Sequence, residues 1–469
     1  MDRSYQVNRS IMDEMPIDLS WKELEDSTNG FSEGRIIGSG GYGVVYKGVY
    51  RNREIAVKKL YHMPGLDEEQ FQNELRILTG LRHQNIIRLI GKSYEEQERC
   101  VEYNGKLVFA KMVDRVICLE YLHKGSLENH LSDESSGMPW HQRYRIIKGT
   151  CEGLKYLHEQ SIFHLDLKPA NILLDNNMLP KIADFGLSKL FSGTRKSHTT
   201  IHFIGTLGYV PPEYIEKGKI SNKFDVFSLG VIIIRIISGP DGYSKLSDMS
   251  TEKFVQLVHK NWKDRLQTAG LKGESYLDAY CNQVKNCIEI ALKCVEKDRH
   301  QRPSIGDIVH SLSGSEATID KLFVVHPLNL CIPFEPDTLI PCQLHLTNNA
   351  DYETAFRIRP RTPGIFAASD YTGIVPAKST MTCILTMQKQ KQPPSNVDSI
   401  LIQCLEYSDD LNDLLYDFDS DFDGCHEFHY EMKDVAITSF FDNASQSTEE
   451  IFSLQSPDSM DEYGIKDRL

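Results

Sequence analysis

The octapeptide HLDLKPAN at residues 164–171, followed by DFG at residues 184–186, constrains this chain more than any other feature. The run places a carboxylate, an ammonium and an amide within six positions, and a second carboxylate stands thirteen residues beyond the amide. Phosphoryl transfer needs this set, because one Asp orients the attacking hydroxyl while an Asn and another Asp hold magnesium on a nucleotide. The residues predicted for these roles are Asp166 and Lys168 for catalysis, and Asn171 and Asp184 as Mg²⁺ ligands.

A glycine-rich segment ahead of this run has the pattern G-x-G-x-x-G-x-V, from Gly38 to Val45, between two strand-like segments. Glycines let a hairpin backbone close over phosphates, and Val45 would pack on adenine. Lys58 follows fifteen residues after Gly43, and Glu74, sixteen residues later, lies on a predicted helix with an apolar stripe. We expect Lys58 to contact ATP phosphates and to pair with Glu74. The predicted ATP-binding residues are Gly38, Gly40, Gly43, Val45, Lys58 and Glu74. The resemblance of these motifs to protein kinases implies further that Glu120 and Leu122 lie in the hinge and that Leu119 is the gatekeeper.

Further motifs follow in the same order along the chain. GTLGY at residues 205–209 precedes Glu213, which has a predicted ion-pair partner in Arg302, and Asp225 is predicted to brace the backbone of the HLD segment. Together these matches span residues 36–312 and resemble a eukaryotic protein kinase, in particular the cytoplasmic members of the plant receptor-like kinase group. The resemblance implies a bilobal α+β fold, with ATP and Mg²⁺ as cofactors. It also implies transfer of the γ-phosphate to serine or threonine hydroxyls of protein substrates.

One position departs from that family. The usual Arg before the catalytic Asp is Leu165 here, and that Arg normally meets a phosphate on the activation segment. We therefore predict that activity depends less on phosphorylation of this segment. The hydroxyls that remain candidate autophosphorylation sites are those of Ser192, Thr194, Ser197, Thr199, Thr200 and Thr206.

After residue 314 the apolar pattern changes to alternation with a period of two, which predicts a small antiparallel, immunoglobulin-like sandwich. LFVVHP at residues 322–327 and CQLHLTNN at residues 342–349 resemble the major sperm protein domain, and the likeness covers residues 321–404. In the related membrane-contact adaptors, the VAP group, a basic face binds FFAT motifs, which are short acidic peptides with two phenylalanines. The candidate face here contains Arg357 and Arg359, both expected to point outward, and Arg361. The alternative is an ordinary solvated strand face.

The net charge of −14 is concentrated at the C-terminal end, because residues 406–469 hold 18 acidic and three basic residues, a balance of −15. This acidity argues against nucleic-acid binding by the tail and predicts a largely disordered segment. Within it, Phe440-Phe441 resembles an FFAT core, and phosphate on Ser445 would supply an acidic group that the motif usually has. Two possibilities stay open: the sandwich binds its own tail, or the tail is simply solvated.

The predicted architecture is a lead with a short helix (1–35), a kinase-like domain (36–314), the sandwich (321–404) and the acidic tail (405–469). Ser20 and Glu23 form a capping box that begins the short helix. The apolar run at 226–237 is too short to span a bilayer, so we expect a cytoplasmic protein that reaches a membrane only through a partner. A non-catalytic nucleotide-binding scaffold is the alternative function. The sequence leaves open the substrate, the upstream signal, the partner of the sandwich, the oligomeric state and the role of the long connection at 94–115.

Overall fold

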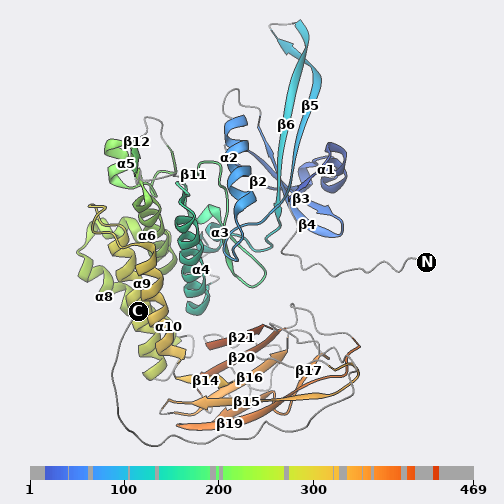
Figure 1. The fold of residues 1–469 in the computed structure, drawn as a ribbon. Helices are drawn as coiled ribbons and strands as arrows, with labels where there is room; N and C mark the ends of the chain where they lie inside the picture. Colours follow the sequence, from blue (N-terminus) through green and yellow to red (C-terminus); the bar gives the residue numbers. More distant parts are fainter. Residues whose placement is uncertain are drawn as a thin grey trace, which may run out of the picture.

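The structure, a computed structural model, has a two-lobed domain followed by a β-sandwich (Figure 1). The residues that it describes are 16–40, 42–61, 67–103, 106–132, 137–190, 197–199, 204–268, 274–320, 322–326, 335–350, 352–360, 364–391, 399–406 and 426–431. Among the helices in these ranges, none combines the length and the apolar character needed to cross a membrane.

The small lobe is built on a six-stranded sheet in the order β1-β5-β6-β4-β3-β2, in which β1 runs parallel to β5 and the other neighbours are antiparallel. The strand-like segments predicted on both sides of the glycine-rich motif are confirmed as β2 and β3. The strands are β1 (Ile17–Asp18), β2 (Ile36–Gly40), β3 (Gly43–Tyr50), β4 (Arg53–Leu60), β5 (Leu89–Tyr103) and β6 (Lys106–Glu120).

The N-terminal lead is part of this lobe. Helix α1 (Trp21–Thr28) begins with the predicted capping box: the Glu23 N–H donates to Ser20 Oγ at 3.4 Å, and the Ser20 N–H donates to Glu23 Oε2 at 2.9 Å. Leu24 is fully buried in an apolar cluster with residues of β4 and β6. Strand β1 adds to the sheet edge with Ile17 opposite Gly91. The predicted boundary at residue 36 therefore falls too late, because the lobe begins at least as early as β1.

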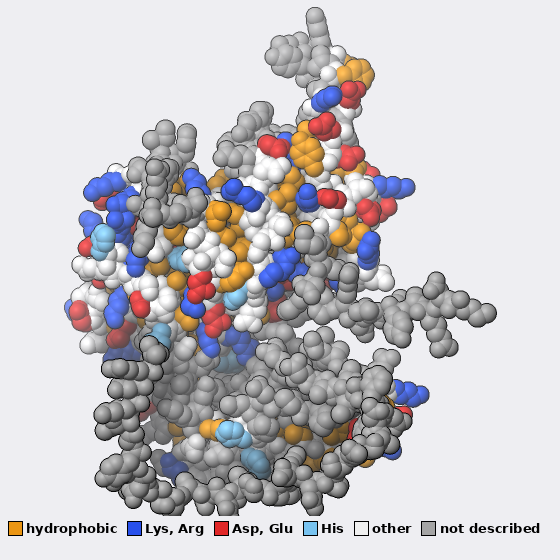
Figure 2. Space-filling view, viewed as in Figure 1, with side chains coloured by type: hydrophobic (Ala, Val, Ile, Leu, Met, Phe, Trp, Pro, Cys, Tyr) orange, Lys and Arg blue, Asp and Glu red, His pale blue; other side chains and the backbone are white. Residues whose placement is uncertain are grey.

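Strands β5 and β6 continue past the sheet as a two-stranded hairpin that projects from the small lobe (Figure 1). This hairpin is the long connection noted at 94–115. Near its tip Leu107 and Phe109 are 75% and 81% exposed, and Figure 2 shows apolar and charged side chains side by side along it. At its base it contacts α2 (Asp67–Gly80), whose predicted apolar stripe is buried in the core.

The large lobe is mainly helical, as predicted, and its core continues into that of the small lobe. Helix α6 is buried along most of its length, which accounts for the apolar run at 226–237. Helix α10 passes through Gly314, so the predicted domain end at residue 314 lies inside a helix. The helices are α3 (Leu127–Ser132), α4 (Trp140–Glu159), α5 (Pro212–Lys217), α6 (Asn222–Ser238), α7 (Gly242–Lys245), α8 (Thr251–Thr268), α9 (Glu274–Cys294) and α10 (Ile305–Asp320). Short strands between them are β7 (Gly125–Ser126), β8 (Ile162–Phe163), β9 (Ile172–Leu174), β10 (Pro180–Ile182), β11 (Lys189–Leu190), β12 (Ser197–Thr199) and β13 (Lys219–Ser221).

The C-terminal part is the predicted antiparallel sandwich, with two four-stranded sheets in the orders β14-β15-β19-β17 and β18-β16-β20-β21. Strand β21 lies in the region that the sequence assigned to a disordered tail, so the sandwich extends farther than predicted. The strands are β14 (Phe323–His326), β15 (Ile340–Asn348), β16 (Thr354–Pro360), β17 (Phe366–Ala368), β18 (Thr372–Val375), β19 (Ser379–Met387), β20 (Ser399–Glu406) and β21 (His426–Glu431).

The predicted basic face of the sandwich needs correction. Arg357 is fully buried, and so is its neighbour Phe356 on the opposite face of β16, so both faces of this strand are covered at these positions. Arg359 is partly exposed, whereas Arg361 lies outside the described residues. Arg357 therefore does not point outward, and its side chain is not accessible to a peptide in this structure. The predicted FFAT-like segment Phe440-Phe441 also lies outside the described residues.

Candidate active site

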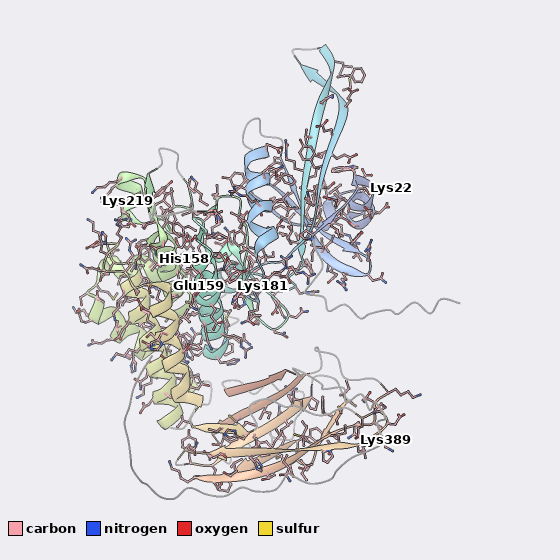
Figure 3. All side chains as sticks on the ribbon, viewed as in Figure 1. Lys22, His158, Glu159, Lys181, Lys219 and Lys389 are labelled. Carbon is pink, nitrogen blue, oxygen red and sulfur yellow. The ribbon has the colours of Figure 1, made fainter. Side chains whose placement is uncertain are left out.

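The HLD segment is held by the first turn of α6, as predicted. The carboxylate of Asp225, which is fully buried, accepts the backbone N–H groups of His164 at 2.9 Å and Leu165 at 2.8 Å. His158, labelled in Figure 3, also lies 3.0 Å from Asp225 through its Nε2. Leu165 takes a left-handed backbone conformation with φ of 65°, which costs free energy in a branched residue and persists only where its surroundings hold it. The brace from Asp225 thus fixes the loop that carries the next residue, Asp166.

Three side chains from two of the predicted motifs meet around Asp166. Lys168 Nζ lies 2.9 Å from Asp166 Oδ2 and donates to Thr206 Oγ1 at 2.9 Å, while that hydroxyl donates to Asp166 Oδ1 at 2.6 Å. Asn171 donates through Nδ2 to the Asp166 carbonyl at 2.8 Å and to its Oδ2 at 3.2 Å. The carboxylate is thereby oriented by three donors. The sequence placed Thr206 at the end of the activation segment but did not predict that its hydroxyl would bond Asp166.

The predicted ion pair between Lys58 and Glu74 is confirmed. Lys58 Nζ donates to Glu74 Oε1 and Oε2 at 3.1 and 2.9 Å, and to Asp184 Oδ1 at 2.7 Å. Burial opposes the charge on Lys58, but Asp184 and Glu74 outweigh it and raise the pKa of this amine above its ordinary value. The charge of Lys58 in turn lowers the pKa of Asp184. Burial raises the pKa of Glu74, and the charge of Lys58 opposes that rise. Strand β4, helix α2 and the DFG motif therefore share one hydrogen-bonded cluster centred on the Lys58 amine.

The glycine-rich hairpin leaves space where the predicted phosphate site lies. In β2 and β3, Gly38 pairs with Val45 and Gly40 with Gly43. A Cβ on Gly43 would lie 2.3 Å from the Lys59 carbonyl oxygen, so only glycine fits this close approach between strands. A Cβ on Gly38 or Gly40 would meet nothing within 4 Å. These two glycines therefore leave their backbone open to a ligand.

The predicted hinge follows β6. Leu119 and Leu122 are buried in the main core, and Val45 packs against the same core. The Glu120 carboxylate is already used within the protein: its Oε1 accepts from the Arg88 N–H at 2.8 Å and from Lys181 Nζ at 2.9 Å. Glu120 could thus contact adenine only through its backbone.

Asn171 and Asp184 fit the donor set of a magnesium site. Mg²⁺ prefers oxygen ligands, usually one or two carboxylates together with phosphate oxygens. Lys58 keeps Asp184 ionised, and Asn171 uses its amide nitrogen toward Asp166, which leaves its carbonyl oxygen as an acceptor. Among the described residues no group of three or more His, Cys, Asp or Glu side chains could hold a metal by itself. The metal would therefore depend on nucleotide phosphates for its other ligands.

An apolar cluster surrounds Leu165, the position at which the sequence resemblance led us to expect an Arg. Leu165 is fully buried, and the other buried members of its cluster are Phe163, Val210, Tyr214, Ile220 and Phe224. Gly205 adopts a φ of 95°, and a Cβ there would lie 2.8 Å from the Leu165 carbonyl oxygen, so this contact requires glycine. Backbone pairing of β11 with β8 and of β12 with β13 also holds the activation segment. Apolar packing and backbone hydrogen bonds thus supply the anchoring.

The predicted pair of Glu213 and Arg302 is confirmed as a bidentate ion pair, with Nη1–Oε1 and Nη2–Oε2 both 2.7 Å. Arg302 is buried at 2% exposure, and its guanidinium also donates to backbone carbonyls such as that of Lys223 at 3.1 Å. A buried pair with satisfied donors links the end of the activation segment to the helical lobe.

Two positioning residues were missed by the sequence. Lys181, labelled in Figure 3, pairs with Glu120 across 61 positions. Asn73 on α2 donates through Nδ2 to the Ser188 carbonyl at 2.7 Å, which ties the helix that carries Glu74 to the chain after DFG. No local pattern distinguishes either residue from an ordinary surface Lys or Asn, because their partners are far away in the sequence.

Comparisons with known proteins agree with this geometry. Residues 31–312 match the protein kinase domain, and residues 322–422 match the MSP (major sperm protein) domain. The G-type lectin S-receptor-like serine/threonine-protein kinase SD1-13 of Arabidopsis thaliana is 34% identical over 319 residues, which cover 67% of this chain and 36% of that protein. Cysteine-rich receptor-like protein kinases 7 and 44 of the same plant are 36% and 34% identical, over 62% and 68% of this chain. The matched parts make up 43% and 83% of those two relatives, so the chain spans less than half of the first two proteins named here.

Proposed function

Because this chain belongs to the protein kinase family, we propose that it transfers the γ-phosphate of ATP to serine or threonine hydroxyls of proteins. One observation carries the proposal: the Lys58–Glu74–Asp184 cluster and the Asp166–Lys168–Thr206 cluster are both assembled in the same structure. The alternative, a non-catalytic scaffold, has no need for either cluster. The retained serine/threonine-type Lys168 and the names of the relatives support the choice of substrate class.

Asp166 would act as the base in this reaction. A substrate hydroxyl that takes the place of the Thr206 hydroxyl beside Oδ1 would be oriented for in-line attack and would give its proton to the carboxylate. The new bond joins the substrate oxygen to the γ-phosphorus, while the bond from that phosphorus to the bridging oxygen of ADP breaks. Lys168, on the other carboxylate oxygen, would place its positive charge next to the transferring phosphoryl group.

Lys58 would orient the α- and β-phosphates, and its pairing with Glu74 makes the position of α2 part of the site. When bound, Mg²⁺ held by Asn171 and Asp184 would neutralise charge on the phosphates. The open backbone at Gly38 and Gly40 would cover them. Leu119, Glu120 and Leu122 would frame adenine. Each of these roles is assigned to a residue of this chain and can be tested separately.

The test compares the native chain with Asp166→Asn in an autophosphorylation assay with labelled ATP and magnesium. We expect label in the native chain and at least about a hundredfold less in the variant, because an amide cannot accept the hydroxyl proton. ATP binding is measured in parallel. If both proteins bind ATP and neither incorporates label into itself or into a generic protein substrate, the scaffold function replaces this one.

We also propose that the sandwich docks a peptide partner, which would recruit this cytoplasmic kinase to a membrane surface through that partner. Support comes from the MSP match and from the partly exposed Arg359, although the buried Arg357 narrows the basic face. Candidate ligands are FFAT-like peptides, including the chain's own segment around Phe440-Phe441. Titration calorimetry of the full chain with a peptide of residues 430–450, with and without phosphate on Ser445, tests whether the sandwich binds the chain's own tail. No heat from either peptide at high concentration would end it.

A further inference from the structure

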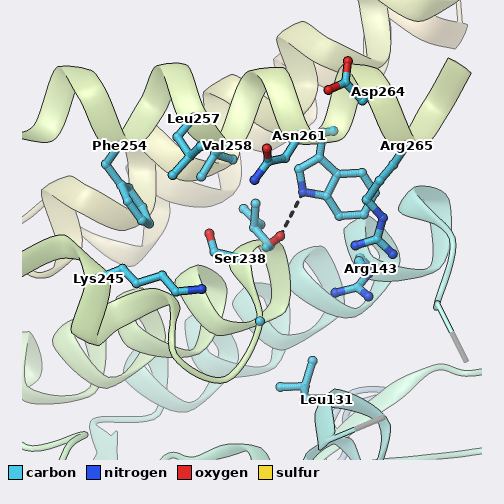
Figure 4. A pocket seen from close by; sticks show the side chains of 13 residues that line it. Leu131, Arg143, Ser238, Lys245, Phe254, Leu257, Val258, Asn261, Asp264 and Arg265 are labelled. Carbon is cyan, nitrogen blue, oxygen red and sulfur yellow. Dashed lines mark hydrogen bonds between the residues drawn. The ribbon is translucent and has the colours of Figure 1, made fainter. Parts of the chain in front are cut away.

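A pocket of about 480 Å³ opens on the large lobe between the end of α6 and helix α8 (Figure 4). None of the residues assigned to phosphoryl transfer lines it. Its wall includes Phe254, Leu257 and Trp262 from one face of α8. The Trp262 ring is 3% exposed, packs edge-on against Trp140 at 5.1 Å, and donates its Nε1–H to the Ile237 carbonyl at 2.9 Å. The Trp262 ring is therefore held in place, and its one polar atom, Nε1, already has a hydrogen-bond acceptor within the protein.

Three cationic side chains line the same pocket: Arg143, Lys245 and Arg265. The guanidinium carbons of Arg143 and Arg265 lie 5.4 and 4.6 Å from the centre of the Trp262 ring, and Figure 4 shows the two groups next to each other beside the indole. Asp264 is the one carboxylate among the lining residues, and its side chain points away from the guanidinium groups in Figure 4. The pocket therefore has an excess of positive charge.

Arg143 makes this excess unusual, because it is 8% exposed and yet has no carboxylate within ion-pairing distance in the described part of the chain. Its Nε donates to the Met138 carbonyl at 2.8 Å and its Nη1 donates to the Ile236 carbonyl. Burial and the nearby charge of Arg265 lower the pKa of the Arg143 guanidinium to about 10, so it stays charged at neutral pH. Arg302 shows the contrast, because that buried guanidinium is matched by the carboxylate of Glu213.

The backbone contacts give Arg143 a structural role, but they do not explain the two other cations. Lys245 and Arg265 are exposed residues on separate elements, and together with Arg143 they place three positive charges along one pocket. Pockets of this size commonly pair an apolar wall with a few charged groups that orient one end of a ligand. Arg forks in turn match the planar oxygens of carboxylates and phosphates.

We propose that this pocket binds a small anionic amphiphile, with a carboxylate or phosphate head among Arg143, Arg265 and Lys245 and a short apolar body against Phe254 and Leu257. The site is separate from the proposed phosphoryl-transfer centre, and its test does not depend on kinase activity.

The experiment is titration calorimetry of the full chain with octyl phosphate, with octanoate and with 1-octanol. The first two probes distinguish a phosphate from a carboxylate head, and the alcohol has the same apolar body without charge. We expect saturable one-to-one binding of at least one anion, about tenfold or more tighter than binding of the alcohol. Equal affinity for octyl phosphate, octanoate and 1-octanol would overturn the proposal.

Variants locate the site. Arg265→Met keeps an apolar contact with Trp262 but removes the charge, and we expect about tenfold weaker anion binding with an unchanged melting temperature. Lys245→Met should act in the same direction. Lys260→Met is the matched control, because Lys260 is exposed on α8 and does not line the pocket. Anion binding that survives in both Arg265→Met and Lys245→Met, or that falls equally in Lys260→Met, would also overturn the proposal.

Discussion

Both lobes combine apolar packing with ion pairs, since α2 buries an apolar stripe and Glu213 pairs with Arg302, but the contacts nearest the catalytic residues differ. In the small lobe, α2 is positioned by charges: Glu74 pairs with Lys58, and Glu68 in its first turn accepts from Arg115 Nε at 2.8 Å, with Nη2 at 2.6 Å. In the large lobe, the activation segment rests on the apolar cluster around Leu165 and on strand pairing. Ion pairs can be made and broken by small movements or by added charge, whereas a buried apolar contact responds to neither.

This difference indicates where control can act. A phosphate on the activation segment would lack the main charged partner that the kinase pattern provides, because position 165 is Leu and not Arg. The position of α2, in contrast, depends on Arg115 at the base of the projecting β5–β6 hairpin. Tyr94 contacts both Arg115 and α2: the centre of its ring lies 5.5 Å from the Arg115 guanidinium carbon and 6.3 Å from the centre of the Phe71 ring of α2. We call the Lys58–Glu74 and Arg115–Glu68 pairs the charged anchor of α2. We expect kinase activity to respond more to changes at this charged anchor than to changes on the activation segment.

The largest effect should follow from removing the central charge of the small lobe. Lys58→Met leaves the buried Glu74 and the partly exposed Asp184 without their shared cation, so we expect kcat to fall about 10²–10³-fold. Steady-state assays with a generic protein substrate measure the change. Lys92→Met is the control, since that side chain is 45% exposed and its ion pair with Asp18 lies at the surface. Retention of more than a tenth of the native kcat would show that the charged anchor does not set activity.

A smaller effect should follow from loosening the second charged contact. Arg115→Gln removes a cation that is 8% exposed, and we expect kcat/KM for ATP to fall about fivefold, in line with about 1 kcal/mol for a partly exposed pair. The exchanged double variant Arg115→Glu with Glu68→Arg should recover part of this loss. Lys111→Gln is the control: Lys111 is exposed on the part of the β5–β6 hairpin beyond the sheet, so this change should leave kcat/KM for ATP unchanged. An equal loss in single and double variants would mean that the ion pair itself does not position α2.

How far the sequence could predict this difference depends on the kind of contact. Lys58–Glu74 and Glu213–Arg302 were predicted because the resemblance to protein kinases implies both members of each pair. Asn73–Ser188 and Lys181–Glu120 were not, since partners 115 and 61 positions apart lack such motifs. The departure at Leu165 was visible in the sequence, but the apolar residues that replace the missing charge contact come from separate segments and meet only in the fold.

The sandwich shows a second limit of prediction from sequence. Alternation along β16 correctly grouped Phe356 with the inner face, but it says nothing about whether the opposite face is covered. Arg357 is buried because the second face of β16 is covered as well, whereas pairing with β18 and β20 protects only the edges of the strand. Strand β21 was missed because its acidic surroundings have the composition of a disordered tail.

The smallest effect should come from the activation segment itself. Converting Ser192, Thr194, Ser197, Thr199 and Thr200 together to Ala removes its candidate phosphate acceptors. We expect kcat to stay within about twofold of native, the range of ordinary surface substitutions, because the apolar cluster and not a phosphate holds the segment. Thr206→Ala, made alone, is the contrasting variant: it should lower kcat because the Thr206 hydroxyl accepts from Lys168 Nζ at 2.9 Å and so helps to position that amine. A loss of more than tenfold in the fivefold variant would place control on the segment after all and remove the distinction between the two lobes.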